Sequence, residues 1–172
     1  MPAPTLRTDR LTLTPPTPAD LDDEAAMWAD PAVYAMIGGR AFTREEVWHR
    51  LLRYIGHWQV CGYGTWIVRT RDGAFAGSVG LMDSRRATEP GYEGTPEAGW
   101  TLAPRAQGRG FALEAMRALL GWADAQGHTR TVCIVDPANA ASLRLADKLG
   151  YRLMTEATYR DVRTLLFERV AR

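Results

Sequence analysis

The segment from Glu97 to Asp124 most constrains what this chain can fold into. A short extended run, Glu97 to Ala103, leads into a turn at residues 104–109, and apolar residues at helical spacing predict a helix from about Gly110 to Gln126. A strand, a glycine turn and a helix N-terminus in this order form an anion site, because the backbone can come close, the first helical N–H groups are free and the helix dipole is positive there. The segment therefore predicts a site for the phosphates of an elongated ligand whose tail lies along the strand.

The turn differs from two common phosphate sites. No Gly-Lys-Ser/Thr follows it, as a P-loop requires, and the three-glycine spacing of a dinucleotide fingerprint is absent. The glycines alone leave the identity of the ligand open.

Three blocks of the sequence resemble the GNAT acetyltransferases. Residues 107–112, Gln-x-x-Gly-x-Ala, resemble the Gln/Arg-x-x-Gly-x-Gly/Ala signature of that superfamily. Residues 139–151 resemble its second block, in which Asn-x-x-Ser is followed by Leu-Gly-Phe/Tyr, and residues 8–13 resemble the start of the RimJ/RimL branch, which acetylates the N-termini of ribosomal proteins. The blocks stand in the family's order and cover nearly the whole chain.

The fold that this resemblance implies is an α/β (α+β) arrangement. Its central sheet is mixed and mostly antiparallel, helices cover both faces, and two central strands splay apart to admit the cofactor. Hydrophobic periodicity and turn residues predict the matching order β-α-α-β-β-β-α-β-α-β-β. The expected strands cover residues 10–14, 63–70, 75–82, 97–103, 131–135, 151–155 and 164–170, and the expected helices cover residues 19–29, 43–60, 110–126 and 138–149.

Composition limits the class of protein and its partners. At 172 residues we expect a single domain over residues 1–172, and the formal net charge of +1 predicts neither a nucleic-acid nor a membrane partner. The two cysteines, Cys61 and Cys133, show no metal-binding spacing, and together with the absence of an apolar leader they favour a cytoplasmic protein without a metal. Both a monomer and a homodimer remain open.

The resemblance implies acetyl-CoA as co-substrate, and it assigns candidate residues that would bind it. The turn would hold the pyrophosphate through backbone N–H groups, two arginines could add positive charge, and the preceding strand would pair with the pantetheine arm. These cofactor-binding candidates are Trp100, Thr101, Leu102, Arg105, Gln107, Gly108, Arg109, Gly110, Phe111, Ala112, Asn139 and Ser142. Leu102 is the candidate for the N–H that polarises the acetyl carbonyl, and Asn139 is equally well explained as a helix N-cap.

Acetyl transfer to an amine also needs a proton donor for the departing thiolate and a base for the amine. Many family members carry a tyrosine where this chain has Ala146, so Ser142 is the remaining candidate donor. Glu97 at the start of the central strand is the candidate base, with a solvated strand-end carboxylate as its alternative explanation, and Glu93 is a weaker candidate.

The acceptor amine is less well defined by the sequence. The branch resemblance favours a protein or peptide N-terminus, and Tyr34 and Trp48 stand where the family places its acceptor-binding helices. A small-molecule amine such as an antibiotic, a polyamine or an amino acid is the alternative substrate. A non-catalytic acyl-CoA sensor, which would keep the glycine turn without the proton chemistry, is the alternative from another class.

Overall fold

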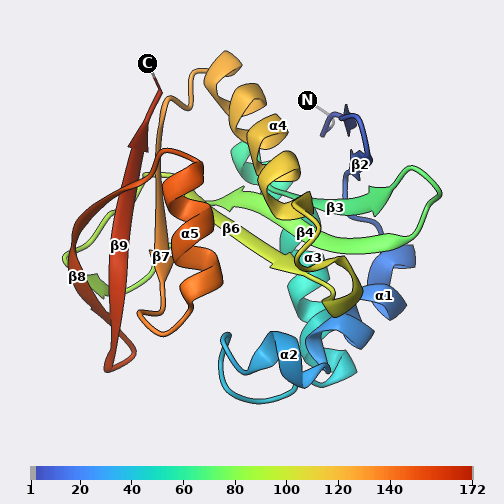
Figure 1. Ribbon diagram of the computed structural model, residues 1–172, viewed down its shortest axis with the longest axis horizontal. Helices are drawn as coiled ribbons and strands as arrows, with labels where there is room; N and C mark the ends of the chain where they lie inside the picture. The colour runs from blue at the N-terminus through green and yellow to red at the C-terminus, as the bar shows by residue number, and fades with distance from the viewer. Residues whose placement is uncertain (1–2, 172) are drawn as a thin grey trace.

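The computed structural model describes residues 3–171, which form a nine-stranded sheet of order β1-β2-β3-β4-β6-β7-β9-β8-β5 (Figure 1). Within these residues every neighbouring pair of strands is antiparallel except β6 and β7. The strands are β1 (Leu6–Arg7), β2 (Leu11–Thr14), β3 (Thr65–Thr70), β4 (Phe75–Met82), β5 (Thr88–Glu89), β6 (Glu97–Leu102), β7 (Arg130–Val135), β8 (Arg152–Tyr159) and β9 (Val162–Val170). The ends of the expected domain, residues 1–2 and 172, lie outside the described residues.

The helices begin and end close to the predicted positions. They are α1 (Leu21–Trp28), α2 (Pro31–Tyr34), α3 (Arg44–Cys61), α4 (Phe111–Ala125) and α5 (Ala140–Lys148), with 3-10 turns at Pro18–Asp20 and Pro104–Ala106. A capping box starts α3: the Glu46 N–H donates to Thr43 Oγ1 (3.2 Å), and the Thr43 N–H donates to the Glu46 carboxylate (2.8 Å). Gly62, with φ +73°, ends the same helix.

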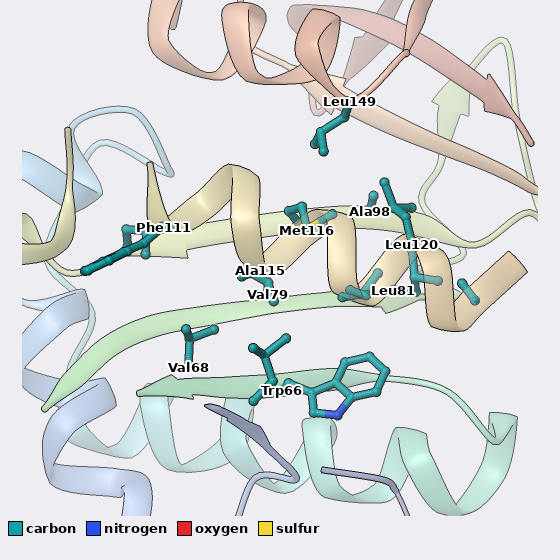
Figure 2. Packing of buried hydrophobic residues seen from close by; sticks show 14 of the residues in the cluster. Trp66, Val68, Val79, Leu81, Ala98, Phe111, Ala115, Met116, Leu120 and Leu149 are labelled. Atoms are coloured by element: carbon teal, nitrogen blue, oxygen red, sulfur yellow. The ribbon is translucent and has the colours of Figure 1, made fainter. Parts of the chain in front are cut away.

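The two faces of the sheet carry different helices. Helices α4 and α5 pack on one face, and α1 and α3 cover the other (Figure 1). Val79 and Leu81 of β4, with Ala98 of β6, point toward α4 (Figure 2). Since successive side chains of a strand alternate between faces, the paired residues Ser78 and Thr101 face α1 and α3.

The main core lies between α4 and the sheet (Figure 2). Met116, Leu119 and Leu120 belong to the apolar stripe that the spacing of the α4 sequence predicts, and all three are buried. Burial of such a side chain stabilises the fold by about 1.5–3 kcal/mol. This packing fixes the N-terminus of α4 at the end of β6.

The sheet opens between β6 and β7. Strand β6 pairs with β4 at six positions, from Glu97 to Leu102, but with β7 at Glu97↔Val132 alone. Figure 1 shows the two strands diverging beyond that point. We call this opening, between residues 98–102 of β6 and residues 133–135 of β7, the seam. The splay implied by the family resemblance is confirmed.

Three short elements, β1, α2 and β5, differ from the predicted order. The sequence predicts no strand between residues 82 and 97, yet β5 lies there and pairs with β8 at the far edge of the sheet, with Thr88 opposite Tyr159. A two-residue strand carries no measurable periodicity, so its sequence does not reveal it. The final hairpin is also longer than predicted, because β8 and β9 continue to a tight turn at Arg160 and Asp161, both with positive φ.

Candidate active site

Two cavities on opposite faces of the sheet meet at the seam. One, of about 430 Å³, lies against α4 and α5, and we call it the α4-side cavity. The other, of about 350 Å³, lies against α1 and α3 and is called the α3-side cavity. Trp100, Thr101, Asn139 and Ser142 line both. Molecules bound in the two cavities would therefore contact each other through the seam.

The glycine turn forms one wall of the α4-side cavity. Gly108 has φ +71° and Gly110 has φ +77°, a left-handed conformation that favours glycine. Gly110 is the N-cap of α4 and contributes no side-chain cap, so the first N–H groups of the helix keep no side-chain partner. Gln107, Phe111 and Ala112 line the same cavity. The geometry suits an anion such as a pyrophosphate.

The cations of this cavity differ from those that the sequence indicated. Arg105 donates to the carbonyl of Phe75 (3.1 and 3.3 Å), and the Arg109 guanidinium stacks over Phe111, so neither side chain is part of the cavity wall. Arg144 and Lys148 of α5 line it instead. Residues four apart on a helix lie on the same face, so the spacing of Arg144 and Lys148 indicates a basic face on α5. This pair is not among the candidates predicted from the sequence.

The backbone of β6 has unused hydrogen-bonding groups at the seam. The Ala103 N–H donates to a carbonyl of β4 (2.9 Å), and the Pro96 carbonyl accepts from β7 (3.0 Å). Because backbone groups point alternately to the two sides of a strand, those of Trp100 and Leu102 face the seam, whereas those of Thr101 face β4. The Leu102 carbonyl accepts from the Gln107 side chain (3.0 Å). The strand can therefore pair with an extended ligand at Trp100 and Leu102.

A hydrogen bond connects the two sides of the seam. Trp100 Nε1 donates to Ser142 Oγ at 3.1 Å. The Asn139 side chain accepts from the Ser142 N–H at 3.0 Å and so caps α5, which is the structural role that the sequence allowed for it. These contacts hold the Ser142 hydroxyl in the opening that the two cavities share.

Glu97 is buried on the α3 side of the sheet. Its side chain is 8 % exposed, and Oε2 accepts from Arg86 Nε and from the Tyr92 hydroxyl, each at 2.7 Å. Burial raises the pKa of Tyr92, and the neighbouring Glu97 charge raises it further. Glu97 is thus a buried, paired carboxylate at the wall of the α3-side cavity, rather than a solvated one, and its role as a base stays a prediction.

Tyr34 and Trp48 are not among the residues that line either cavity. The α3-side wall comes from Arg50, Arg53 and Tyr54, whose spacing places them on one face of α3. Trp48 belongs to α3, which supplies part of this wall, whereas Tyr34 belongs to α2, and the acceptor-binding role of both stays a prediction.

A mixed sheet that opens beside a glycine turn is the arrangement expected of an acetyltransferase. Residues 10–152 match the family described as the acetyltransferase (GNAT) domain. The chain belongs to this family of acyltransferases.

Solved structures agree with this assignment. A protein from Bordetella pertussis, provisionally described as a GNAT-family acetyltransferase, is 35% identical with a TM-score of 0.86 over 98% of this chain and 100% of that one. An acetyltransferase from Agrobacterium tumefaciens strain C58 is 29% identical with a TM-score of 0.84 over 98% and 95%. RimL, a ribosomal L7/L12 alpha-N-protein acetyltransferase solved with coenzyme A, shares the fold at 15% identity with a TM-score of 0.79 over 98% of each chain.

Among curated proteins, the uncharacterized protein YkkB of Bacillus subtilis (strain 168) is 33% identical over 93 residues. That match covers 52% of this chain and 52% of YkkB, about half the length of each.

None of the helices within residues 3–171 combines the length and apolarity that crossing a membrane requires. In the same part of the chain, no three His, Cys, Asp or Glu side chains are grouped as metal ligands.

Proposed function

We propose that this chain transfers the acetyl group of acetyl-CoA directly to a primary amine, and that the amine is a protein or peptide N-terminus. The meeting of two cavities at the seam is the observation that carries the proposal. A thioester held on the α4 side and an amine held on the α3 side would approach each other from opposite faces of the sheet. Holding two reactants in this way supplies much of the rate enhancement of a group transfer.

The α4-side cavity suits coenzyme A in both charge and shape. The N–H groups at Gly110 and the first turn of α4 would bind the pyrophosphate, and Arg144 and Lys148 lie on the same wall for further phosphate oxygens. The pantetheine arm would pair with Trp100 and Leu102 as an added strand does.

The residues at the seam account for the proton transfers. The Leu102 N–H would stabilise the charge on the acetyl oxygen. Because Trp100 donates to Ser142 Oγ, the Ser142 hydroxyl keeps its own hydrogen to give to the departing thiolate. Glu97 would accept the proton of the amine, through water where the two do not touch.

No cysteine of the described residues offers an acyl-enzyme route. Cys133 is buried in β7, and burial raises the pKa of its thiol far above the ordinary value. Burial also raises the pKa of Cys61, and neither cysteine lines one of the two cavities. Direct attack of the amine on the thioester is therefore the mechanism we propose.

The acceptor assignment rests on the RimJ/RimL resemblance and on the fold shared with RimL. The test is free-thiol release from acetyl-CoA with peptides of varied N-termini, amino acids, polyamines and aminoglycosides, together with a direct measurement of acetyl-CoA binding. Release with peptides supports the proposal, and release with small amines alone replaces the acceptor class while keeping the chemistry. Acetyl-CoA binding without transfer to any amine would favour the sensor function. The sequence argument for a sensor is that Ala146 stands where many family members carry a tyrosine.

A further inference from the structure

Arginines outnumber acidic residues on the wall of the α3-side cavity. Arg50 and Arg53 come from α3, Arg86 from the loop before β5, and Arg163 from β9. The acidic residues on the wall are Glu97 and Asp136. The charge of this cavity depends on which of these groups neutralise one another.

Two of the arginines are neutralised by carboxylates. Arg86 pairs with Glu97 at 2.7 Å, and Arg163 pairs with Glu156 of β8. Asp136 accepts from the backbone N–H of Ala138 within its own loop and is exposed to solvent. In residues 3–171, neither Arg50 nor Arg53 forms an ion pair with a carboxylate.

Arg50 is held in place without a counter-charge. Its guanidinium lies 4.2 Å from the centroid of the Trp28 ring and 4.9 Å from that of Phe42, and it donates to the Tyr54 hydroxyl at 3.4 Å. Stacking on aromatic rings fixes a guanidinium plane while its N–H edge stays available for an anion.

Arg53 stands three residues further along the same face of α3. Arg53 is exposed to solvent, and its guanidinium lies over the Tyr54 ring, 5.8 Å from the centroid. Arg50 and Arg53 line the same cavity, so one anion can contact both guanidinium groups and offset the repulsion between two like charges.

Glu24 of α1 is close enough to Arg50 to interact with its charge but forms no ion pair with it. It is buried behind the wall and is not a lining residue, and its Oε2 accepts from Trp28 Nε1 at 2.9 Å. Burial raises the pKa of Glu24 to about 7, so near neutral pH it carries only part of a negative charge. It cannot balance both Arg50 and Arg53.

We propose that the acceptor carries an anionic group, a carboxylate or a phosphate, which binds Arg50 and Arg53 while its amine lies at the seam. This inference rests on the proposed function and narrows its substrate class. An N-terminus followed closely by Asp or Glu fits it, as does a small amine that bears a carboxylate or phosphate. Polyamines and aminoglycosides do not fit, because their positive charges would face the arginines.

The test uses matched acceptors that differ in charge. Peptides beginning Ser-Asp-Asp and Ser-Lys-Lys form one pair, and phosphoethanolamine and ethanolamine form a second pair that separates a free small amine from a peptide. Both binding in the presence of CoA and acetyl transfer from acetyl-CoA are measured. We expect the acidic member of at least one pair to bind about tenfold more tightly or more, as charge-assisted hydrogen bonds allow.

Variants connect this preference to the arginines. Arg53→Gln should raise Kd and KM for the acidic acceptor about tenfold while acetyl-CoA binding stays unchanged, and Arg53→Glu should reverse the preference between the paired peptides. Arg50→Gln provides a second variant, and Arg117→Gln, on the exposed side of α4 away from both cavities, is the matched control.

The two proposals fail in different ways. If acidic acceptors bind to the wild type and not to Arg53→Gln, the inference is supported even when no acetyl group is transferred. The absence of transfer would count against the proposed function alone. Equal binding of acidic and basic acceptors, or a preference for acidic ones that Arg53→Gln and Arg50→Gln leave intact, overturns the inference whether or not transfer occurs.

Discussion

Trp100 Nε1 donates a hydrogen bond to Ser142 Oγ across the seam, at 3.1 Å. The two residues come from opposite sides of the opening, Trp100 from β6 and Ser142 from α5. The bond occupies a lone pair of the hydroxyl oxygen and leaves the hydroxyl hydrogen to be donated elsewhere. In this arrangement the indole orients the group that we propose as the proton donor.

Replacing Ser142 by Ala should lower kcat about a hundredfold, because the thiolate then departs without a proton donor. Acetyl-CoA binding, measured by calorimetry, should be preserved. Trp100→Phe removes the orienting N–H but keeps the donor, so its loss of kcat should be smaller. Full activity of Ser142→Ala would exclude the proposed role.

Replacing Gly110 by Ala should weaken acetyl-CoA binding about tenfold, because a left-handed conformation costs a residue with a side chain about 1–2 kcal/mol and the free turn then relaxes away from the shape that presents its N–H groups. An added Cβ meets only the flexible end of Arg10, at 3.4 Å, so the fold should survive. Gly121→Ala in the same helix is the control: no atom lies within 4 Å of its added Cβ, and the change should leave binding unchanged. Equal affinity of both variants would remove the phosphate site from the turn.

Replacing Glu97 by Gln should lower kcat about a hundredfold if its carboxylate is the base. The same change leaves Arg86 without its counter-charge, so KM for an acidic acceptor should fall at the same time. This split between kcat and KM distinguishes catalysis from a general loss of structure. Glu89→Gln is the matched control, since Glu89 is an exposed carboxylate of the same segment that lines neither cavity, and it should be silent. A Glu97→Gln enzyme with wild-type kcat would assign the base elsewhere.

Glu24 should make the stability of the protein depend on pH. Burial raises its pKa from an ordinary value of 4.5 to about 7, so between these values the folded protein binds more protons than the unfolded chain. The stabilising contribution of the protonated form is complete below about pH 4.5 and is lost as pH rises through about 7, a loss of up to about 3 kcal/mol.

Urea unfolding of the wild type and of Glu24→Gln at pH 5 and pH 8 measures this effect. Between pH 5 and pH 8 the wild type should lose free energy of unfolding relative to Glu24→Gln. The difference between the wild type and the exposed Glu45→Gln control should stay constant. A constant difference for Glu24→Gln as well would show that the carboxyl group is ionised at both pH values.

Local patterns in the sequence predicted much of this fold. The helices expected over residues 43–60 and 110–126 and the strands expected over residues 63–70 and 75–82 each depend on residues near one another in the chain, and each is confirmed. Local sequence patterns do not predict where two neighbouring strands separate. The seam was therefore expected only from the family resemblance.

The α3-side cavity was less predictable, because it depends on residues far apart in the chain. Arg50 and Arg53 of α3, Glu97 of β6 and Arg163 of β9 share its wall only after the sheet has formed. In the sequence Arg50 and Arg53 cannot be distinguished from ordinary surface arginines. The structure shows that Trp28 and Phe42 stack against Arg50 at the wall of this cavity.

The single pairing point between β6 and β7 also has a thermodynamic consequence. A ligand that pairs with the seam supplies contacts that the bare sheet lacks, so its binding adds directly to the free energy of unfolding, by about 2.7 kcal/mol when its concentration is a hundred times Kd. Resistance to unfolding by heat or urea would then rise with the concentration of the ligand that occupies the seam.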